Sequence, residues 1–329
     1  MKYVNLPDDM IRPLPFYLAM EEYIARNTDM PDEMFFMWQV RPTVIFGRNQ
    51  VMEREVNMDF CRSRGIEVYR RKSGGGCVYA DMDNVMFSYV SRCESPVAVT
   101  FSRYTSMVAD MLRSLGLRAE NTSRNDVLID GRKVSGNAFY HIPGRSIVHG
   151  TMLFDTDVEV MTKAITPSRI KLDGRGVESV RSRVTTLREY FPDMDIEEFK
   201  AYARGYLCDG AVHLSASDVE RIADLERGYH DDSWIAGRRS DGCAVKRIER
   251  RIEGVGCFSV AVATDSSHRI SDVDITGDYL LTGDMDSLLV DRLKGVEYTP
   301  ESVRGAMSDI TIGNVVYGMT DEQLINILF

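Results

Sequence analysis

A short basic and glycine-rich run is the first place where this sequence could do chemistry. Residues 70–72, Arg-Arg-Lys, stand directly before Ser73 and three consecutive glycines, Gly74–Gly76. Glycine weakens a β-strand unless the backbone must turn sharply or approach another group closely. The patterns GxxxxGKS/T and GxGxxG are absent and a strand is expected after Gly76, so a phosphate site at a helix N-terminus is not indicated. The run predicts a β-turn-β loop whose N–H groups bind an anion, with a mobile glycine hairpin as the alternative.

Lys133 is the second candidate, on the strand pair that residues 125–140, NDVLIDGRKVSGNAFY, predict. Asp130-Gly131 is a favoured two-residue hairpin turn. With that turn Asp126 would oppose Ser135, and Lys133 would lie diagonal to Asp126 on one face, within reach of its carboxylate. A cross-strand ion pair on a solvated face is one interpretation, and such a pair contributes little. The small residues after the lysine favour the other interpretation, a cation beside an open backbone.

A histidine and an arginine-rich segment complete the candidates. His149 stands in an apolar, strand-like stretch, where a lone histidine is more often a satisfied core residue than a functional one. The segment 175–187, RGVESVRSRVTTL, interleaves arginines with valines. It is either the charged face of an amphipathic element or a loop that folds over an anionic ligand.

These side chains need a scaffold of helices and strands, and the hydrophobic pattern supplies one. Helical spacing of apolar residues predicts helices over 14–27, 103–116, 196–207, 217–227 and 320–329. Alternating or apolar runs predict strands within 34–50, broken at Arg41-Pro42, and over 65–71, 84–90, 125–140 and 257–280. We therefore expect an α/β chain of the α+β type, with a large mixed-sheet domain over 1–242 and a small α/β domain over 243–329.

The composition restricts the class of protein. The 329 residues are 44% hydrophobic and 27% charged, an ordinary globular mixture. A net charge of −10 argues against general binding of nucleic acid. No apolar run approaches the ~20 residues that a membrane-spanning helix needs, and the N-terminus lacks the features of a signal peptide. The six scattered cysteines favour reduced thiols, so we expect a cytoplasmic protein without structural zinc or disulfides.

Seven segments in chain order resemble the lipoate–protein ligase family. They are LAMEEY, PTVIFGRNQ, RRKSGGGCVY, DMDN, NDVLIDGRKVSGNAF, HGTMLF and RGVESVRSRVTTL. The resemblance implies a large mixed-sheet catalytic domain of the biotin/lipoate-ligase type, followed by a small C-terminal α/β accessory domain. Biotin ligases share this catalytic fold, but their basic GRGRRG-type phosphate loop is missing here.

A reaction in two halves is what the resemblance implies. Lipoate attacks the α-phosphate of ATP, with Mg²⁺ assisting, to give lipoyl-AMP and pyrophosphate. A specific lysine of a lipoyl-accepting carrier domain then takes the lipoyl group. The implied acceptors are the E2 subunits of 2-oxoacid dehydrogenases and the H protein of the glycine cleavage system. No metal site fixed by the protein is implied, because Mg²⁺ would arrive with ATP.

The resemblance also implies site residues. Lys133 is the expected catalytic residue, bridging the lipoyl carbonyl oxygen and the phosphate. Asn84 is expected to read adenine. The expected ATP and lipoyl-AMP site comprises Arg71, Ser73, Gly74, Gly75, Gly76, Cys77, Val78, Tyr79, Asn84, Asp126, Lys133, Arg181 and Arg183. The expected lipoate pocket comprises Leu18, Trp38, Arg71, Ser73 and His149. A loop over 165–187 is expected to cover the adenylate, and the small domain to change position between the half-reactions.

Two departures from the family pattern keep alternatives open. Ala80 stands where a histidine is common, and Cys77 where an alanine is common. A related branch of this fold transfers octanoyl or lipoyl groups through a cysteine thioester without ATP, although Cys77 is not at the position associated with that nucleophile. The second alternative is a non-catalytic protein that binds an adenylate or a carrier domain.

Overall fold

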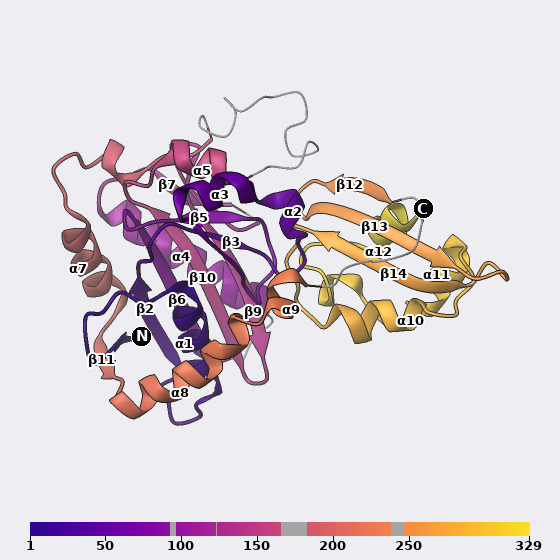
Figure 1. Cartoon of the computed structure of the whole chain (residues 1–329), viewed down its shortest axis with the longest axis horizontal. Helices are drawn as coiled ribbons and strands as arrows, with labels where there is room; N and C mark the ends of the chain where they lie inside the picture. Colours follow the sequence, from indigo (N-terminus) through magenta and orange to yellow (C-terminus); the bar gives the residue numbers. More distant parts are fainter. Residues whose placement is uncertain (93–96, 123, 166–182, 238–246) are drawn as a thin grey trace.

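The large region of the chain is built around a main mixed β-sheet, seen in the left-hand part of Figure 1. The computed structural model describes residues 1–92, 97–122, 124–165, 183–237 and 247–329. Within them the strand order is β11-β1-β2-β6-β10-β9-β8-β7, parallel from β11 to β2 and antiparallel beyond. The strands are β11 (Gly210–His213), β1 (Lys2–Asn5), β2 (Glu33–Trp38), β6 (Asn84–Arg92), β10 (Arg145–Leu153), β9 (Arg132–Ile142), β8 (Asp126–Ile129) and β7 (Ala119–Asn121).

Helices cover both faces of this sheet, so its strands are buried on both sides. Along β6, Val85 and Phe87 pack into the core formed with α4 (Val97–Ser114) and α7 (Ile196–Leu207). Met86 and Val90 pack on the other side, where α1 (Leu14–Arg26) and α8 (Ala216–Glu226) lie. Because successive side chains of a strand point to opposite faces, this alternation places Met86 on the same side as α1.

A second, three-stranded sheet carries the glycine run. Its order is β4 (Glu67–Arg70), β3 (Thr43–Phe46) and β5 (Val78–Ala80). The chain leaves β4 at Arg70 and re-enters the sheet at Val78, so Gly74–Gly76 join two strands. Three short helices pack against this sheet: α2 (Met52–Glu55), α3 (Met58–Arg64) and α5 (Val158–Ala164).

The C-terminal region has an antiparallel sheet and a hydrophobic core of its own. Thr320 and Gln323 form a capping box at the start of the last helix. The strands are β12 (Ile248–Ile252), β13 (Gly256–Thr264) and β14 (Ile270–Gly277). The helices are α10 (Asp291–Leu293), α11 (Pro300–Ala306), α12 (Asp321–Leu328) and the π-helical turn Asp286–Val290. This region also contains the 3₁₀ turn Ile312–Asn314, and shorter elements elsewhere are α9 (Asp232–Ala236) and the 3₁₀ turns Leu187–Glu189 and Arg227–Tyr229.

The C-terminal sheet lies beside α2 in Figure 1, and specific contacts join the two regions. Arg54 of α2 donates to the Ser259 hydroxyl at 3.2 Å. The N–H of Gly277 donates to the carbonyl of Asn49 at 2.8 Å, and Arg124 donates to the carbonyl of Asp278 at 2.9 Å. Leu280 is buried in the core of the large region.

Most of the expected architecture is confirmed, and one register is wrong. The large mixed sheet and the smaller C-terminal α/β region are present, and Asp130 and Gly131 turn with φ values of +49° and +76°. Asp126 opposes Gly136 instead of Ser135, because the register shifts by one residue after the Leu128–Lys133 pair. The expected domain junction at 242/243 lies outside the described residues. None of the helices among the described residues is long and apolar enough to cross a membrane.

Candidate active site

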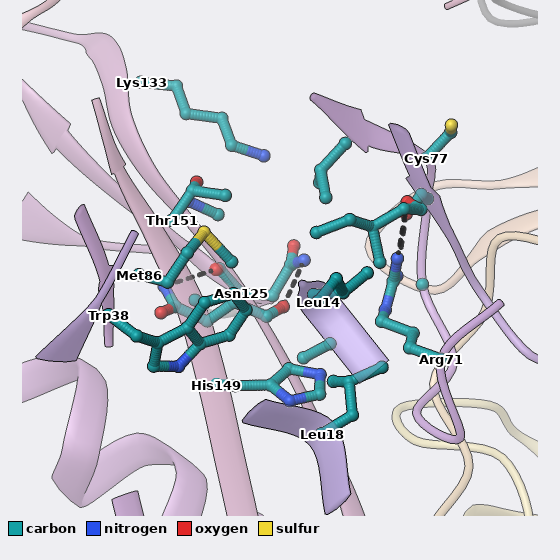
Figure 2. Close-up of a pocket in the computed structure, with 18 residues that line it drawn as sticks. Leu14, Leu18, Trp38, Arg71, Cys77, Met86, Asn125, Lys133, His149 and Thr151 are labelled. Carbon is teal, nitrogen blue, oxygen red and sulfur yellow. Dashed lines mark hydrogen bonds between the residues drawn. The ribbon is translucent and has the colours of Figure 1, made fainter. Parts of the chain in front are cut away.

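A small pocket opens between the glycine run and the main sheet. Its volume is about 90 Å³. Figure 2 shows apolar side chains from α1, β2 and β6 on one side of it and Lys133 reaching in from β9. The apolar lining consists of Leu14, Leu18, Trp38, Ile45, Val78 and Met86. The pocket is therefore suited to an aliphatic chain that ends near a positive charge.

The Arg71 side chain holds the glycine run in shape. Its guanidinium is buried and donates to the carbonyls of Gly74 and Gly76 at 2.7 Å each, to the carbonyl of Ile45 at 3.0 Å and to the Ser73 hydroxyl at 2.9 Å. Burial lowers the pKa of Arg71 to about 10, which leaves it protonated at neutral pH. Arg71 thus lines the pocket, as expected, while most of its N–H groups bind the protein's own backbone.

The other two charges of the basic triplet also bind within the protein. Arg70 donates to the carbonyls of Arg48 at 2.7 Å and Ala236 at 3.0 Å. Lys72 pairs with Glu22 at 2.5 Å. Although burial raises the pKa of Glu22, hydrogen bonds from Lys72 and Arg26 outweigh it and lower that pKa. The positive charge at this pocket therefore comes from Lys133 and the buried Arg71, and not from the whole triplet.

Each glycine of the run has a different neighbour. Gly75 has a φ of +83°, a conformation that residues with side chains rarely adopt. Its carbonyl oxygen lies 2.3 Å from the place where a Cβ on Gly47 would stand. A Cβ on Gly74 would stand 2.3 Å from the carbonyl oxygen of Tyr279 in the C-terminal region. Gly76 lines the pocket. The run therefore serves a turn and two close backbone contacts as well as the pocket.

Lys133 lines the pocket, and Figure 2 shows it across the pocket from Arg71 and Cys77. Its ammonium is 2.7 Å from the Asp126 carboxylate, as the diagonal placement predicted, and its side chain is 35% exposed. A Cβ on Gly136 would stand 2.5 Å from the ammonium nitrogen, so this glycine leaves the space that the lysine occupies. The backbone of Lys133 is fixed by hydrogen bonds to Arg183 and Thr185. A positioned but partly solvated cation can move from Asp126 to an anionic ligand.

A buried polar chain lies under the apolar part of the pocket. The Ser73 hydroxyl is 2.7 Å from Nε2 of His149, and Nδ1 of His149 is 2.9 Å from the Glu21 carboxylate. Ser88 donates to Glu21 at 2.5 Å and accepts from the Trp38 indole at 2.8 Å. The expected pocket residues Trp38, Ser73 and His149 thus lie together. Sequence reasoning missed Glu21 and Ser88, although the pair Glu21-Glu22 in an otherwise apolar helix was a signal.

The remaining expected residues are spread around the pocket. Leu18, Cys77, Val78 and Gly75 line it. Tyr79 points into the core beside α3 and α5, and Asn84 is fully buried with its carbonyl oxygen Oδ1 unpaired. Arg183 is exposed and contributes its carbonyl to the Lys133 backbone. Arg181 and positions 166–182 of the expected covering loop lie outside the described residues.

Asn125 and Asn137 line the pocket and were not predicted. Asn125 donates to the carbonyl of Asn137 at 2.8 Å, and Asn137 donates to the carbonyl of Asn125 at 3.1 Å. A Cβ on Gly150 would stand 1.9 Å from Oδ1 of Asn137. The sequence signal was the pair of asparagines that flank the lysine hairpin, together with the His149-Gly150 step.

Cys77 and His149 do not form a nucleophilic pair. Both ring nitrogens of His149 are engaged, one by Ser73 and the other by Glu21. Figure 2 places the Cys77 sulfur on the side of the pocket away from His149. A base within hydrogen-bond reach is one common way in which a thiol becomes an activated nucleophile, and His149 does not supply it here. In the described part of the chain, no group of three or more His, Cys, Asp or Glu side chains is arranged to hold a metal ion.

The chain matches two family models. Residues 13–207 match the lipoyl protein ligase A/B catalytic domain, and residues 245–328 match the bacterial lipoate protein ligase C-terminus. Among curated relatives, the lipoate-protein ligase LplJ of Bacillus subtilis (strain 168) is 30% identical over 322 residues, which cover 95% of this chain and 96% of the relative.

Solved structures share the fold. LipL1 of P. falciparum superposes with a TM-score of 0.75 at 20% identity and covers 99% of this chain and 97% of its own. A lipoate-protein ligase A superposes with a TM-score of 0.59 at 23% identity and covers 72% of this chain and 98% of its own. The mixed-sheet architecture described above is therefore the architecture of known lipoate ligases.

Proposed function

The chain belongs to the lipoate–protein ligase family, and from this premise we propose that it joins lipoate to ATP as lipoyl-AMP and then transfers the lipoyl group to a lysine of an acceptor protein. As a member of the family it is an enzyme, a ligase that attaches lipoate to protein in an ATP-dependent reaction. LipL1 was solved in complex with lipoate and the ligase A was solved with bound ATP, which supports both substrates.

The observation that carries this proposal is the position of Lys133. Its ammonium stands beside an apolar pocket that Gly75 and Gly76 of the glycine run also line. Lipoyl-AMP is a mixed anhydride, in which an anionic phosphate is joined to the carbonyl group of the lipoyl chain. The apolar pocket accepts the acyl chain, and the cation and backbone N–H groups surround its reactive end.

Both half-reactions then use the same cation. In the first, a carboxylate oxygen of lipoate attacks the α-phosphorus of ATP and the bond to the departing pyrophosphate breaks. In the second, the neutral amine of the acceptor lysine attacks the carbonyl carbon, the bond to AMP breaks, and the proton of the amine passes to solvent. Lys133 stabilises the negative charge that develops on the phosphate and carbonyl oxygens. Asp126 holds the ammonium in position between these events.

Other residues take roles set by their places. Leu18 and Trp38 contact the acyl chain, and Ser73 and His149 support its pocket from below. Gly75, Gly76, Cys77 and Val78 border the anhydride with their backbone. Asn84 reads adenine, for which its buried and unpaired carbonyl oxygen offers an acceptor. We keep Gly74, Tyr79, Arg181 and Arg183 as further candidates for the nucleotide site.

The alternative of a cysteine thioester has less support. It requires a base for Cys77, and His149 is committed to Ser73 and Glu21. A non-catalytic docking protein would not require a lysine and a carboxylate paired at 2.7 Å over a glycine at a pocket mouth.

The proposal extends to partners, location and domain division. The acceptors are lipoyl-accepting carrier domains of the E2 and H-protein classes, and neither nucleic acid nor membrane is a partner. Mg²⁺ is held mainly by the phosphates of ATP, since oxygen ligands from substrate commonly hold this ion. We propose a cytoplasmic enzyme with a catalytic domain over 1–242 and an accessory domain over 243–329.

Exchange of labelled pyrophosphate into ATP tests the proposal. A ligase that forms lipoyl-AMP reversibly catalyses this exchange only when lipoate is present. A thioester transferase and a docking protein give no exchange with or without lipoate. The same assay without lipoate is the control for exchange by contaminating adenylate-forming enzymes.

A further inference from the structure

A chain of hydrogen bonds connects the far side of the acyl pocket to the glycine run. It passes from the Trp38 indole to Ser88, to Glu21, to His149, to Ser73 and to Arg71. All six side chains are buried. Arg71 then donates to the carbonyls of Gly74 and Gly76. The floor of the pocket and the loop that borders the anhydride are thus joined by a continuous path.

The two ends of this hydrogen-bonded series fix the direction of the bonds next to them, and one arrangement of protons gives every remaining group a partner. A guanidinium only donates, so Ser73 accepts from Arg71 at 2.9 Å and has its own O–H to give to Nε2 of His149. Nε2 is then an acceptor, so the proton of a neutral imidazole is on Nδ1, where it is donated to the Glu21 carboxylate. At the other end the indole N–H only donates, so Ser88 gives its O–H to Glu21.

A doubly protonated His149 does not fit this arrangement. An N–H on Nε2 would give Ser73 two incoming donors and leave the serine proton without this acceptor. It would also add a second buried positive charge beside Arg71, while the Glu21 carboxylate provides one negative charge. An uncompensated buried charge is costly, so the neutral form with the proton on Nδ1 is the favoured one.

We propose that Glu21 is a positioning residue that holds His149 in the Nδ1–H tautomer and thereby couples the acyl pocket to the geometry of the glycine run. This inference rests on the proposed function. It assigns the Trp38 end of the hydrogen-bonded series to the acyl part of lipoyl-AMP and the Arg71 end to the phosphate part. Glu21 touches neither part. It acts through His149, Ser73 and Arg71, which together set where the Gly74 and Gly76 carbonyls and the adjoining N–H groups point.

The Glu21→Gln variant distinguishes a role in fixing the His149 tautomer from a role in merely filling buried space. The side chains have nearly the same shape, but both carboxylate oxygens lie within 3.0 Å of Nδ1, so in either orientation the amide places an N–H donor beside Nδ1–H. Because two donors repel, His149 should shift its proton to Nε2, and Ser73 should then receive donors from both sides. We expect the KM for ATP in pyrophosphate exchange to rise roughly tenfold, the cost of about one hydrogen bond to a charged group.

Two further variants serve as controls. Glu22→Gln removes a neighbouring buried carboxylate of the same helix. Glu22 pairs with Lys72 and Arg26 and is not a member of the hydrogen-bonded series that includes His149. It should retain the Nδ1–H tautomer. Ser88→Ala breaks the link to Trp38 and leaves the carboxylate, so it should also retain the tautomer while raising the KM for lipoate.

The tautomer is measured by nitrogen-15 NMR of histidine-labelled protein, in which one signal of five is assigned by a His149→Asn variant. The expected wild-type spectrum shows a neutral ring protonated on Nδ1. A wild-type ring protonated on Nε2, or on both nitrogens near neutral pH, overturns the proposal even if Glu21→Gln does not fold. An unchanged tautomer, or an unchanged KM for ATP, in folded Glu21→Gln also overturns it. Absence of lipoate-dependent exchange in the wild type would instead refute the proposed function.

Discussion

The backbone N–H of Gly75 donates to the carbonyl oxygen of Tyr279 at 2.8 Å, so the glycine run is bonded directly to the C-terminal region. The same oxygen lies 2.3 Å from the place of a Cβ on Gly74. Leu280 follows, with Cδ2 3.3 Å from the place of a Cβ on Gly75. In this arrangement the Gly75 N–H is engaged by the protein itself, so an adenylate that uses this donor competes with the C-terminal region for it.

Gly74→Ala should displace the C-terminal region from the glycine run. The added methyl would meet the Tyr279 carbonyl, a backbone atom that cannot rotate away. We expect a loss of about 1–3 kcal/mol in the free energy of unfolding, measured by denaturant titration. Gly205→Ala on α7 is the matched control, because no atom lies within 4 Å of its added methyl and a helical alanine should stabilise slightly. Equal stability of Gly74→Ala and wild type would refute the contact.

The sequence predicted many of the elements and the lysine hairpin because both depend on local patterns. The first helix, the two strands broken at Arg41-Pro42 and the Asp130-Gly131 turn each have a signal within a few residues. The register error has a physical cause of a different kind. The shift leaves Val134 unpaired and fully buried, and it places Gly136 under the Lys133 side chain, so packing of the lysine and the core decided it.

The rest of the site depends on contacts between distant residues. Glu21, Ser88 and His149 meet only because α1 packs on the strands β6 and β10. The glycines were interpreted as room for a ligand, but Gly74 faces Tyr279, more than 200 positions along the chain. No spacing rule within one segment reveals such neighbours. The sequence identified candidate catalytic residues, but it did not identify the residues that orient them.

Lys133→Ala should abolish adenylate formation and lysine transfer together. Loss of the cation removes the charge that stabilises both transition states, and we expect at least a ~100-fold drop in pyrophosphate exchange. The protein should fold, because the Lys133–Asp126 pair is partly solvated and such pairs contribute little to stability. Arg132→Ala is the control, since it removes a neighbouring cation that pairs with Glu189 at 2.8 Å, outside the pocket. A folded Lys133→Ala enzyme with more than a tenth of normal exchange would remove Lys133 from its role.

Cys77→Ala should leave ligation nearly unchanged. ATP supplies the activation that a thioester would otherwise provide, and the ring nitrogens of His149 are bound to Ser73 and Glu21. Transfer of lipoate to an acceptor domain, followed by mass spectrometry, measures the effect. Cys61→Ala, a change at a fully buried cysteine, controls for general destabilisation. If Cys77→Ala folds and no longer transfers the lipoyl group, the thioester mechanism gains the support that it now lacks.

Asp81 should make the protein less stable as the pH rises from about 4 to about 6. Burial raises the pKa of Asp81 from 3.8 to about 6, although the N–H groups of Asp157 and Asp83 act in the opposite direction. The folded protein therefore binds this proton more tightly than the unfolded chain, and its advantage is present at low pH and lost as the carboxyl ionises. Relative to Asp81→Asn, wild type should lose up to about 3 kcal/mol over this range, measured by urea unfolding. Asp83→Asn removes a like charge that contributes to the raised pKa of Asp81, so it should reduce the slope without abolishing it; an equal slope in wild type and Asp81→Asn would contradict the assignment.

Leu280→Ala should loosen the C-terminal region from the glycine run without disabling the pocket. Leu280 is 1% exposed and packs in the core of the large region with Ala138 and Phe139. Removing its side chain leaves a cavity at this junction, and such changes cost about 2–5 kcal/mol in closed cores. The pocket lining does not include Leu280, so lipoate-dependent exchange should remain within about threefold of wild type.

The Gly75 amide reports on this junction directly, because it is bonded to Tyr279 next to Leu280. In Leu280→Ala its hydrogen exchange should accelerate, since each opening of the junction breaks that bond. Leu289→Ala is the matched control: it removes the same side chain from the separate core of the C-terminal region. Leu289→Ala should lose stability without a selective increase in the hydrogen exchange of the Gly75 amide. Addition of lipoate and ATP should protect the amide again in Leu280→Ala if the ligand takes over the donor. Equal exchange at Gly75 in both leucine variants would show that Leu280 does not hold the junction closed.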